Sequence, residues 1–171
     1  MNQKTREINI SEEKDYVIRE MNGGDLSAVD LIGRSSFSTD RFHWDARIPK
    51  KVADESRAQW VVNSYKKGLA EIVYVAEYNN EVVGFVTGNI RKDSENILET
   101  KTAKSGLMAV HPRLRGKGIG KALAMRKIKW AYDIGLDQVE VGTQSHNKVV
   151  RLYEDIGYRV VSTDVTFHKH I

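Results

Sequence analysis

The residues best suited to chemistry lie in one short segment, residues 110–121, with the sequence VHPRLRGKGIGK. Its three glycines would let the backbone turn at the start of a helix, so that several N–H groups converge on one point. The helix dipole adds roughly half a positive charge there, and the Lys and Arg side chains add full charges. Groups of this kind bind phosphate and diphosphate strongly. We therefore interpret the segment as an anion-binding loop.

The spacing of these glycines excludes two common nucleotide-binding motifs. A dinucleotide-binding fingerprint would have its third small residue at the position of Leu123. A Walker loop would need glycine in place of Arg115, and serine or threonine in place of Ala122 to hold magnesium. Neither a nicotinamide cofactor nor a nucleoside triphosphate is expected.

Positive charge is concentrated around the same segment. The chain carries 27 Lys and Arg against 23 Asp and Glu, a net charge of +4. Residues 112–130 hold seven of these cations and no acid: Arg113, Arg115, Lys117, Lys121, Arg126, Lys127 and Lys129. Such a local excess favours a discrete polyanionic ligand over a nucleic acid duplex. The chain has no cysteine, which excludes disulfides, thiolate metal ligands and cysteine nucleophiles, and no metal site is predicted.

The pattern of apolar residues predicts the elements that must position this loop. Runs rich in β-branched and aromatic residues predict strands at 16–21, 72–78, 81–90, 138–142, 158–165 and 166–169, and a further strand ends at 106–110. Apolar stripes at helical spacing indicate helices that follow Asp25 and that cover 53–67, 118–133 and 147–156. Asn79 and Asn80 suit a two-residue hairpin turn. These elements predict a mixed α/β sheet, with residues 1–14 as a flexible extension and 15–171 as one domain.

Residues 115–120, with a strand before them and a helix after them, fit the pattern Arg/Gln-x-x-Gly-x-Gly/Ala. At this point the chain resembles the GCN5-related N-acetyltransferase (GNAT) family, from residue 16 to the C-terminus. The resemblance implies a GNAT-type α/β fold, a mixed, mostly antiparallel twisted sheet flanked by helices, with acetyl-CoA as co-substrate. It also implies the residues that bind this coenzyme, namely Met108, Ala109, Val110, Arg115, Gly116, Lys117, Gly118, Ile119, Gly120, Lys121 and Asn147.

The same resemblance implies that Tyr153 is the general acid at the sulfur of the thioester. Acyl transfer needs a neutral amine, a donor for the developing oxyanion and a proton for the leaving thiolate. Strand N–H groups at 108–110 can serve the oxyanion, and the lack of cysteine favours direct attack in a ternary complex over an acyl-enzyme. Considered alone, Asn147 is also a good helix cap and Tyr153 a core aromatic. His146 is a candidate base, but no base is assigned.

Two further stretches, residues 37–49 and 141–147, bear on the acceptor. They resemble GNAT enzymes that acetylate nucleotide-linked amino sugars such as dTDP-fucosamine. The substrate-binding residues implied are Phe37, Arg41, His43 and Gln144. The cationic side chains could meet a diphosphate, the aromatic ring could cover a base or a sugar, and the amide could hold a sugar hydroxyl. An ordinary hydrophobic cap with solvated charges explains the same residues equally well.

The resulting hypothesis is a cytoplasmic N-acetyltransferase that uses acetyl-CoA and a small-molecule amine. A protein N-terminus, a polyamine or an aminoglycoside stay open as acceptors, as does a non-catalytic CoA-binding module. Nucleic acid is disfavoured because the cations lie in the glycine loop and helix rather than among stacking aromatics. The sequence contains no run of 18 apolar residues and no secretory h-region, so neither a membrane nor export is expected. A homodimer is left open.

Overall fold

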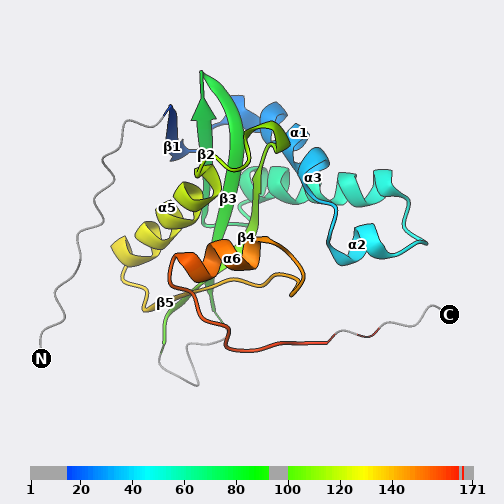
Figure 1. Ribbon diagram of the computed structural model, residues 1–171. Helices are drawn as coiled ribbons and strands as arrows, with labels where there is room; N and C mark the ends of the chain where they lie inside the picture. The colour runs from blue at the N-terminus through cyan, green and yellow to red at the C-terminus, as the bar shows by residue number, and fades with distance from the viewer. Residues whose placement is uncertain (1–14, 93–99, 166, 168–171) are drawn as a thin grey trace, which may run out of the picture.

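The computed structural model describes residues 15–92, 100–165 and 167, so the expected extension at residues 1–14 lies outside it. The described residues form a five-stranded sheet in the order β1-β2-β3-β4-β5 (Figure 1). Strands β1 to β4 pair antiparallel, and β5 pairs parallel with β4. The strands are β1 (Tyr16–Glu20), β2 (Ile72–Tyr78), β3 (Glu81–Arg91), β4 (Thr102–Val110) and β5 (Gln138–Glu140). This mixed, mostly antiparallel α/β sheet confirms the predicted fold class.

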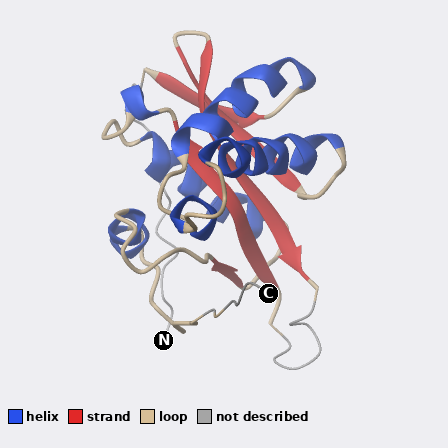
Figure 2. Ribbon diagram, turned by 90° about the vertical axis from the view of Figure 1, so that its right-hand side faces the viewer, coloured by secondary structure: helices blue, strands red, loops and turns tan. Residues whose placement is uncertain are grey.

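Helices cover both faces of the sheet, as Figure 2 shows. One face carries α1 (Leu26–Ser36) and α3 (Lys50–Lys66), which are joined through the short helix α2 (Arg41–Trp44). The other face carries α5 (Ile119–Asp133) and α6 (Val149–Asp155), both in front of the sheet in Figure 1. None of the helices in the described ranges is both long and apolar enough to cross a bilayer.

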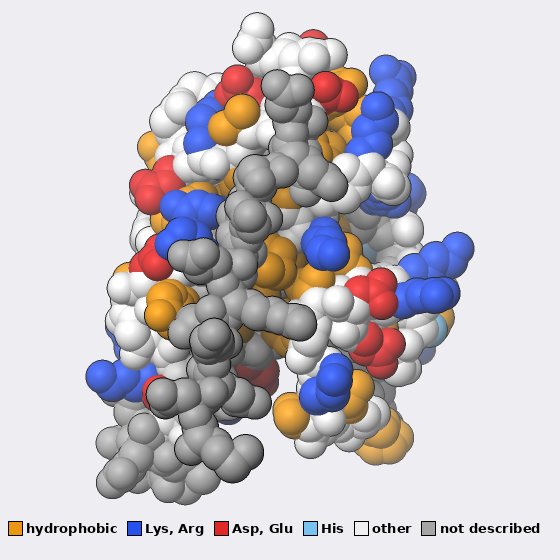
Figure 3. Space-filling view, turned by 60° about the vertical axis from the view of Figure 1, so that its left-hand side comes forward, with side chains coloured by type: hydrophobic (Ala, Val, Ile, Leu, Met, Phe, Trp, Pro, Cys, Tyr) orange, Lys and Arg blue, Asp and Glu red, His pale blue; other side chains and the backbone are white. Residues whose placement is uncertain are grey.

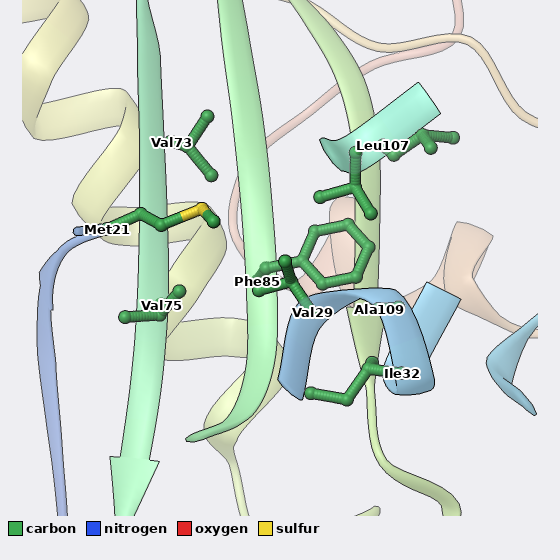
Figure 4. Packing of buried hydrophobic residues seen from close by; sticks show 9 residues of the cluster. Met21, Val29, Ile32, Val73, Val75, Phe85, Leu107 and Ala109 are labelled. Carbon is green, nitrogen blue, oxygen red and sulfur yellow. The ribbon is translucent and has the colours of Figure 1, made fainter. Parts of the chain in front are cut away.

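Alternation along the strands divides the buried apolar side chains into two clusters, one on each face. Val29 and Ile32 of α1 pack against Phe85 of β3 and against Leu107 and Ala109 of β4 (Figure 4). On the opposite face, Ile119 and Leu123 of α5 pack against the other side of β2 and β3. Strand β4 is therefore fixed from both sides, which gives the segment that follows it a rigid support.

Two turns of the chain have the geometry that their residues favour, whereas the start of α1 is held in another way. Asn79 and Asn80 have φ of 50° and 61°, the left-handed values that a two-residue hairpin turn requires. Gly157, with φ of 97°, follows the end of α6, within one residue of the predicted end at 156. Helix α1 begins where Asp25 predicted it, but the Asp25 carboxylate caps nothing at α1, because it accepts from the Asn22 N–H and pairs with Arg19.

The prediction of a strand at residues 158–165 is wrong. This segment follows α6 without regular structure, and the side chains of Val160, Val161 and Val165 are 72%, 86% and 74% exposed. Strand propensity measures how well a side chain fits a half-buried pleated surface, and here the described residues supply no neighbouring strand. Most of the strand predicted at 166–169 lies outside the described residues.

Candidate active site

The predicted anion-binding loop connects β4 to α5. After β4 ends, a 3₁₀ turn (Pro112–Leu114) leads to Gly116 and Gly118, whose φ values of 81° and 79° lie in the left-handed region that favours glycine. The Arg115 guanidinium holds this path in place, because it donates to the carbonyl oxygens of Val110 (3.2 Å) and Ser36 (2.9 Å). The Arg115 side chain therefore fastens the loop to β4 and to the end of α1.

The loop presents unpaired hydrogen-bond donors at the start of α5. Among the described residues, none accepts a hydrogen bond from the backbone N–H groups of residues 116–121; the first bond of the helix runs from the Ala122 N–H to the Gly118 oxygen (3.0 Å). A Cβ atom added at Gly116 would meet nothing within 4 Å, so this side of the loop is open. Open, unpaired amides at a helix N-terminus suit a diphosphate. The arrangement fits the pyrophosphate of a coenzyme.

The charges around these amides have the same sign. Arg113, Lys117 and Lys121 are exposed, and the Lys117 ammonium lies 5.2 Å from the centre of the Tyr78 ring. In the view of Figure 3, Lys and Arg side chains lie on both sides of the molecule, with several along its right-hand edge. Positive charge beside unpaired amides strengthens the attraction for a polyanion.

Strand β4 extends well beyond its parallel partner. The register joins Thr102, Ala103 and Lys104 to residues 138–140 of β5, and pairing stops there. From residue 105 to residue 110, β4 has no neighbour on this side within the described part of the chain. The two strands thus part in front of the anion-binding loop, and the backbone of β4 has an open edge.

The hydrogen-bond pattern shows which groups of β4 face this open edge. The His111 N–H donates to the Val83 oxygen (2.8 Å), and antiparallel alternation then directs the polar groups of Ala109 to β3 as well. Met108 and Val110 turn their N–H and C=O groups the other way, to the open edge. Of the strand residues predicted to bind the coenzyme, these two have backbone groups in position to do so, and Ala109 does not.

Tyr153 lies on α6 with its ring packed against Tyr158, the two ring centres being 5.4 Å apart. The Tyr153 side chain is 8% exposed, and no residue in the described ranges hydrogen-bonds to its hydroxyl. Burial raises the pKa of this hydroxyl to about 12. The group therefore keeps its proton at neutral pH and stays available as a proton donor.

The side chain of Asn147 is used within its own loop. Its amide nitrogen donates to the Thr143 hydroxyl (3.2 Å), and its oxygen accepts from the Val149 N–H (3.1 Å) at the start of α6. This is the helix-capping role that the residue type alone suggests. Its backbone N–H bonds to the Gln144 oxygen (2.9 Å), so the whole turn before α6 is internally connected.

The two predicted acceptor segments meet in the structure. The Trp44 ring stacks on His146 with ring centres 4.2 Å apart, and His146 Nε2 lies 3.3 Å from the Thr39 oxygen. Arg41 is exposed above the Phe42 ring. Helix α2 therefore lies against the loop that precedes α6. Sequence analysis predicted both segments but not the contact between them.

The His43 side chain is buried and bonded to two carboxylates, so it is not open to a ligand. Its side chain is 4% exposed, and its ring nitrogens lie 2.9 Å from Asp40 Oδ2 and 3.0 Å from Asp54 Oδ1. Asp40 also accepts from Arg57 Nε (2.9 Å). Desolvation opposes ionisation of Asp40, but the Arg57 guanidinium holds the pKa of this carboxyl below its usual range. The network joins α2 to α3, so of the predicted acceptor residues Arg41 is more accessible than His43.

Replacing Arg57 by leucine is expected to destabilise the protein by about 3 kcal/mol. The change leaves Asp40 buried without its guanidinium partner, and broken buried ion pairs cost about 3–5 kcal/mol. Urea unfolding of the two proteins measures the difference. Arg34→Leu is the control, because Arg34 pairs with Asp30 and Glu55 at the surface and should matter much less. Equal losses in the two variants would contradict a buried network.

Sequence analysis missed that Tyr158 packs on Tyr153, and that Lys127, which bonds to Ser105, lies beside Tyr158. Lys127 was counted with the cations of residues 112–130, yet it is 1% exposed. A sequence signal did exist, because Lys127 lies four residues after Leu123 and four before Ala131, on the apolar stripe of α5.

Comparison with known sequences supports a family relationship. The Acetyltransferase (GNAT) family pattern matches residues 39–158. The spore coat polysaccharide biosynthesis protein SpsD of Bacillus subtilis is 32% identical over 146 residues, which are 85% of this chain and 47% of SpsD. N-acetylaspartate synthetase of Danio rerio is 35% identical over 98 residues, 57% of this chain and 33% of that protein. The chain thus spans about half or less of these two relatives.

Solved structures share the fold. An aminoglycoside N-acetyltransferase in complex with CoA has a TM-score of 0.64 at 18% identity, covering 91% of this chain and 95% of that one. An agmatine N-acetyltransferase has a TM-score of 0.69 at 15% identity, with 87% and 85% covered. At such identities the likeness concerns the fold alone.

Proposed function

The chain belongs to the GNAT family of acetyltransferases, and on that premise we propose that it transfers acetyl from acetyl-CoA, by direct attack, to the primary amine of a nucleotide-linked amino-deoxy sugar. One observation carries the proposal: the unpaired amides of residues 116–121 lie beside the open edge of β4. Acetyl-CoA, when bound, supplies an acetyl group activated as a thioester. Such a ligand has a diphosphate for the loop and amide groups for a strand edge.

The residues that would hold the coenzyme divide into two groups. The amides of residues 116–121, helped by the charges of Lys117 and Lys121, would bind the diphosphate. Met108 and Val110 would bind the pantetheine arm with their backbone groups and orient the thioester. A Met108 N–H aimed at the thioester oxygen would stabilise the negative charge that develops on it.

Tyr153 would act at the sulfur. Its hydroxyl keeps its proton at neutral pH, because burial raises its pKa to about 12. A thiolate that leaves next to this hydroxyl can take up the proton, which assists cleavage of the carbon–sulfur bond. Since the chain has no cysteine, attack by the acceptor amine itself is the simplest route.

The acceptor side is supported by the name of SpsD and by the surface formed where α2 meets the loop before α6. SpsD is described as a spore coat polysaccharide biosynthesis protein, which places that relative in sugar chemistry. Trp44, 64% exposed, and His146 offer stacked rings to a base or a sugar, and the exposed Arg41 offers a cation to a diphosphate. Gln144, half-buried in the same loop, could bind a sugar hydroxyl.

A panel of amines tests the acceptor class directly. The protein is incubated with acetyl-CoA and with dTDP- and UDP-linked amino sugars, the free amino sugars, aminoglycosides, polyamines and peptides, and products are read by mass spectrometry. We expect one added acetyl on a nucleotide-linked sugar and at least a tenfold lower kcat/KM for the free sugar, since losing the diphosphate contact costs about 1.4 kcal/mol or more.

Two other results would contradict the proposal. Efficient acetylation of a polyamine, aminoglycoside or peptide, with no reaction of the sugar nucleotides, would show that the acceptor belongs to that other class. Binding of acetyl-CoA without transfer to any amine would indicate a non-catalytic module.

A further inference from the structure

The most unusual buried group in the described part of the chain is the amine of Lys127. Its side chain is 1% exposed between α5 and the sheet, and the only hydrogen bond that the structure gives its ammonium is donated to the Ser105 hydroxyl. No carboxylate in the described ranges pairs with it, so burial lowers the pKa of the Lys127 amine to about 8. An ammonium can donate three hydrogen bonds, and a buried charge with one neutral partner is costly.

A second unpartnered polar group lies next to it. The Lys127 ammonium is 5.9 Å from the centre of the Tyr158 ring, and the Tyr158 hydroxyl is buried with no hydrogen-bond partner. Burial also raises the pKa of that hydroxyl, with a further rise from the nearby Tyr153. The Tyr158 ring in turn packs on Tyr153, so a continuous line of side chains leads from Lys127 to the proposed general acid.

In this cluster of Lys127, Ser105, Tyr158 and Tyr153, Ser105 is the member that lies where β4 and β5 part. Lys104 is the last β4 residue paired with β5, and Ser105 follows it directly. Groups that face Lys127 come from β4 (Ser105) and from the segment that follows α6 (Tyr158), while the β3 residue beside its stem is Gly88, which has no side chain. The positive charge is therefore at the closed end of the opening that would receive the thioester.

Packing alone does not explain a lysine at this position. Replacing a buried charge with an apolar side chain of similar volume is often neutral or stabilising. Unpaired buried donors and perturbed ionisable groups are concentrated at functional sites, where a ligand completes them. As the thioester is cleaved, negative charge develops on the sulfur of the leaving thiolate. A nearby ammonium would stabilise this charge.

We propose that Lys127 is a positioning residue that acts through Tyr153 and Tyr158, stabilising the thiolate that leaves and returning a proton to Tyr153. The proposal rests on the proposed acetyl transfer. As the carbon–nitrogen bond forms and the carbon–sulfur bond breaks, the Tyr153 hydroxyl gives its proton to sulfur. The Tyr158 hydroxyl makes no hydrogen bond in the structure, so it is free to bridge Lys127 and Tyr153 once Tyr153 is ionised. Lys127 then restores the Tyr153 proton by way of this hydroxyl, and the neutral Lys127 amine takes up a proton from water. The proton that the attacking amine releases goes to solvent, so each turnover is balanced.

The first test uses the unaltered protein and does not measure activity. The Lys127 ammonium is titrated by nitrogen-15 NMR in the free protein, with CoA, and with a CoA analogue that lacks the sulfur. We expect CoA to raise the pKa of Lys127 by about one unit, a tenfold change in proton affinity, because a bound thiolate stabilises the ammonium. The analogue should leave this pKa unchanged. Equal titrations with both ligands would overturn the proposal.

The second test uses Lys127→Met, with Lys129→Met as the matched control on the exposed side of α5. Lys127→Met should melt at the same temperature as the unaltered protein or higher, while its kcat falls about 100-fold and the KM for the acceptor is unchanged. The ultraviolet absorbance of the bound CoA thiolate should show a thiol pKa about one unit higher. Lys129→Met should match the unaltered protein in all four measurements.

Retention of full kcat and of the thiol pKa in Lys127→Met would overturn the proposal. If that variant fails to fold, Tyr158→Phe decides, because it removes only a hydroxyl without a partner: about a tenfold lower kcat at unchanged melting temperature supports the proton path, and an unchanged kcat contradicts it. Failure of the proposed acetyl transfer is seen separately, as a lack of product with the unaltered protein, and leaves the NMR titration interpretable.

Discussion

Tyr153→Phe is expected to lower kcat about 100-fold or more while leaving the affinity for acetyl-CoA nearly unchanged. The phenylalanine ring fills the same buried position against Tyr158, so packing is kept and only the proton donor is lost. A general acid that acts in the transition state contributes about 10²–10⁴-fold to a rate. Steady-state kinetics at saturating acceptor, together with a titration of acetyl-CoA binding, separates the two effects.

The choice of leaving group makes this prediction specific. An acidic aromatic thiol is a good leaving group, so its acetyl thioester needs little protonation when the thiolate leaves. With such a thioester as acetyl donor, the kcat of the unaltered protein divided by that of Tyr153→Phe should fall towards one. Tyr132→Phe is the control, because Tyr132 is 70% exposed on α5 and touches none of this machinery. An unchanged kcat in Tyr153→Phe would return Tyr153 to the role of an ordinary core aromatic.

The features that sequence analysis predicted well depend on a few adjacent residues. Asn79 and Asn80 form the hairpin turn because asparagine tolerates positive φ, so the conformation of the turn depends on these two residues alone. Gly116 and Gly118 do the same for the loop between β4 and α5. The apolar spacing over 118–133 likewise predicted a helix, which α5 confirms. Local conformational preference and the apolar period act together at each of these places.

The features that were missed depend on partners distant in the sequence. His43 was expected to face a substrate, but Asp54, on a different helix, occupies one of its ring nitrogens. Lys127 was grouped with solvated cations, because net charge by segment does not distinguish a buried side chain from an exposed one. The segment 158–165 has strand-forming residues, but its propensity does not specify a neighbouring strand.

Which residues of β4 turn their backbone groups to the open edge depends on the register of the strand. Sequence analysis assigned Met108, Ala109 and Val110 together, since a strand as a unit was expected to offer its backbone. The bond from His111 to Val83 sets the phase of the ladder and leaves Met108 and Val110, but not Ala109, on the open edge. A shift of one residue would have exchanged these roles, and no residue type along β4 encodes that choice.

Gly118→Val is expected to weaken binding of acetyl-CoA about 100-fold. At φ of 79°, Gly118 has a backbone conformation that a β-branched residue rarely adopts, so the loop must change its path. A change of path moves the amides of residues 116–121 away from a common point. Losing two charge-assisted hydrogen bonds accounts for such a change, because each contributes about 1.5–3 kcal/mol and 100-fold in Kd is about 2.7 kcal/mol.

Gly135→Val separates this effect from backbone strain. Gly135 lies just beyond the other end of α5 and has φ of 75°. A Cβ added there meets nothing within 4 Å, and at Gly118 it makes only an ordinary contact, 3.6 Å from the Tyr16 hydroxyl. Both valine variants should lose about 1–3 kcal/mol of stability, because the strain is similar. At 100 times the Kd of the unaltered protein, acetyl-CoA should stabilise Gly135→Val by about 2.7 kcal/mol but Gly118→Val by only about 0.4 kcal/mol. Equal stabilisation of the two variants would show that the diphosphate does not bind to these amides, and both the loop and the reaction assigned to it would then have to be abandoned.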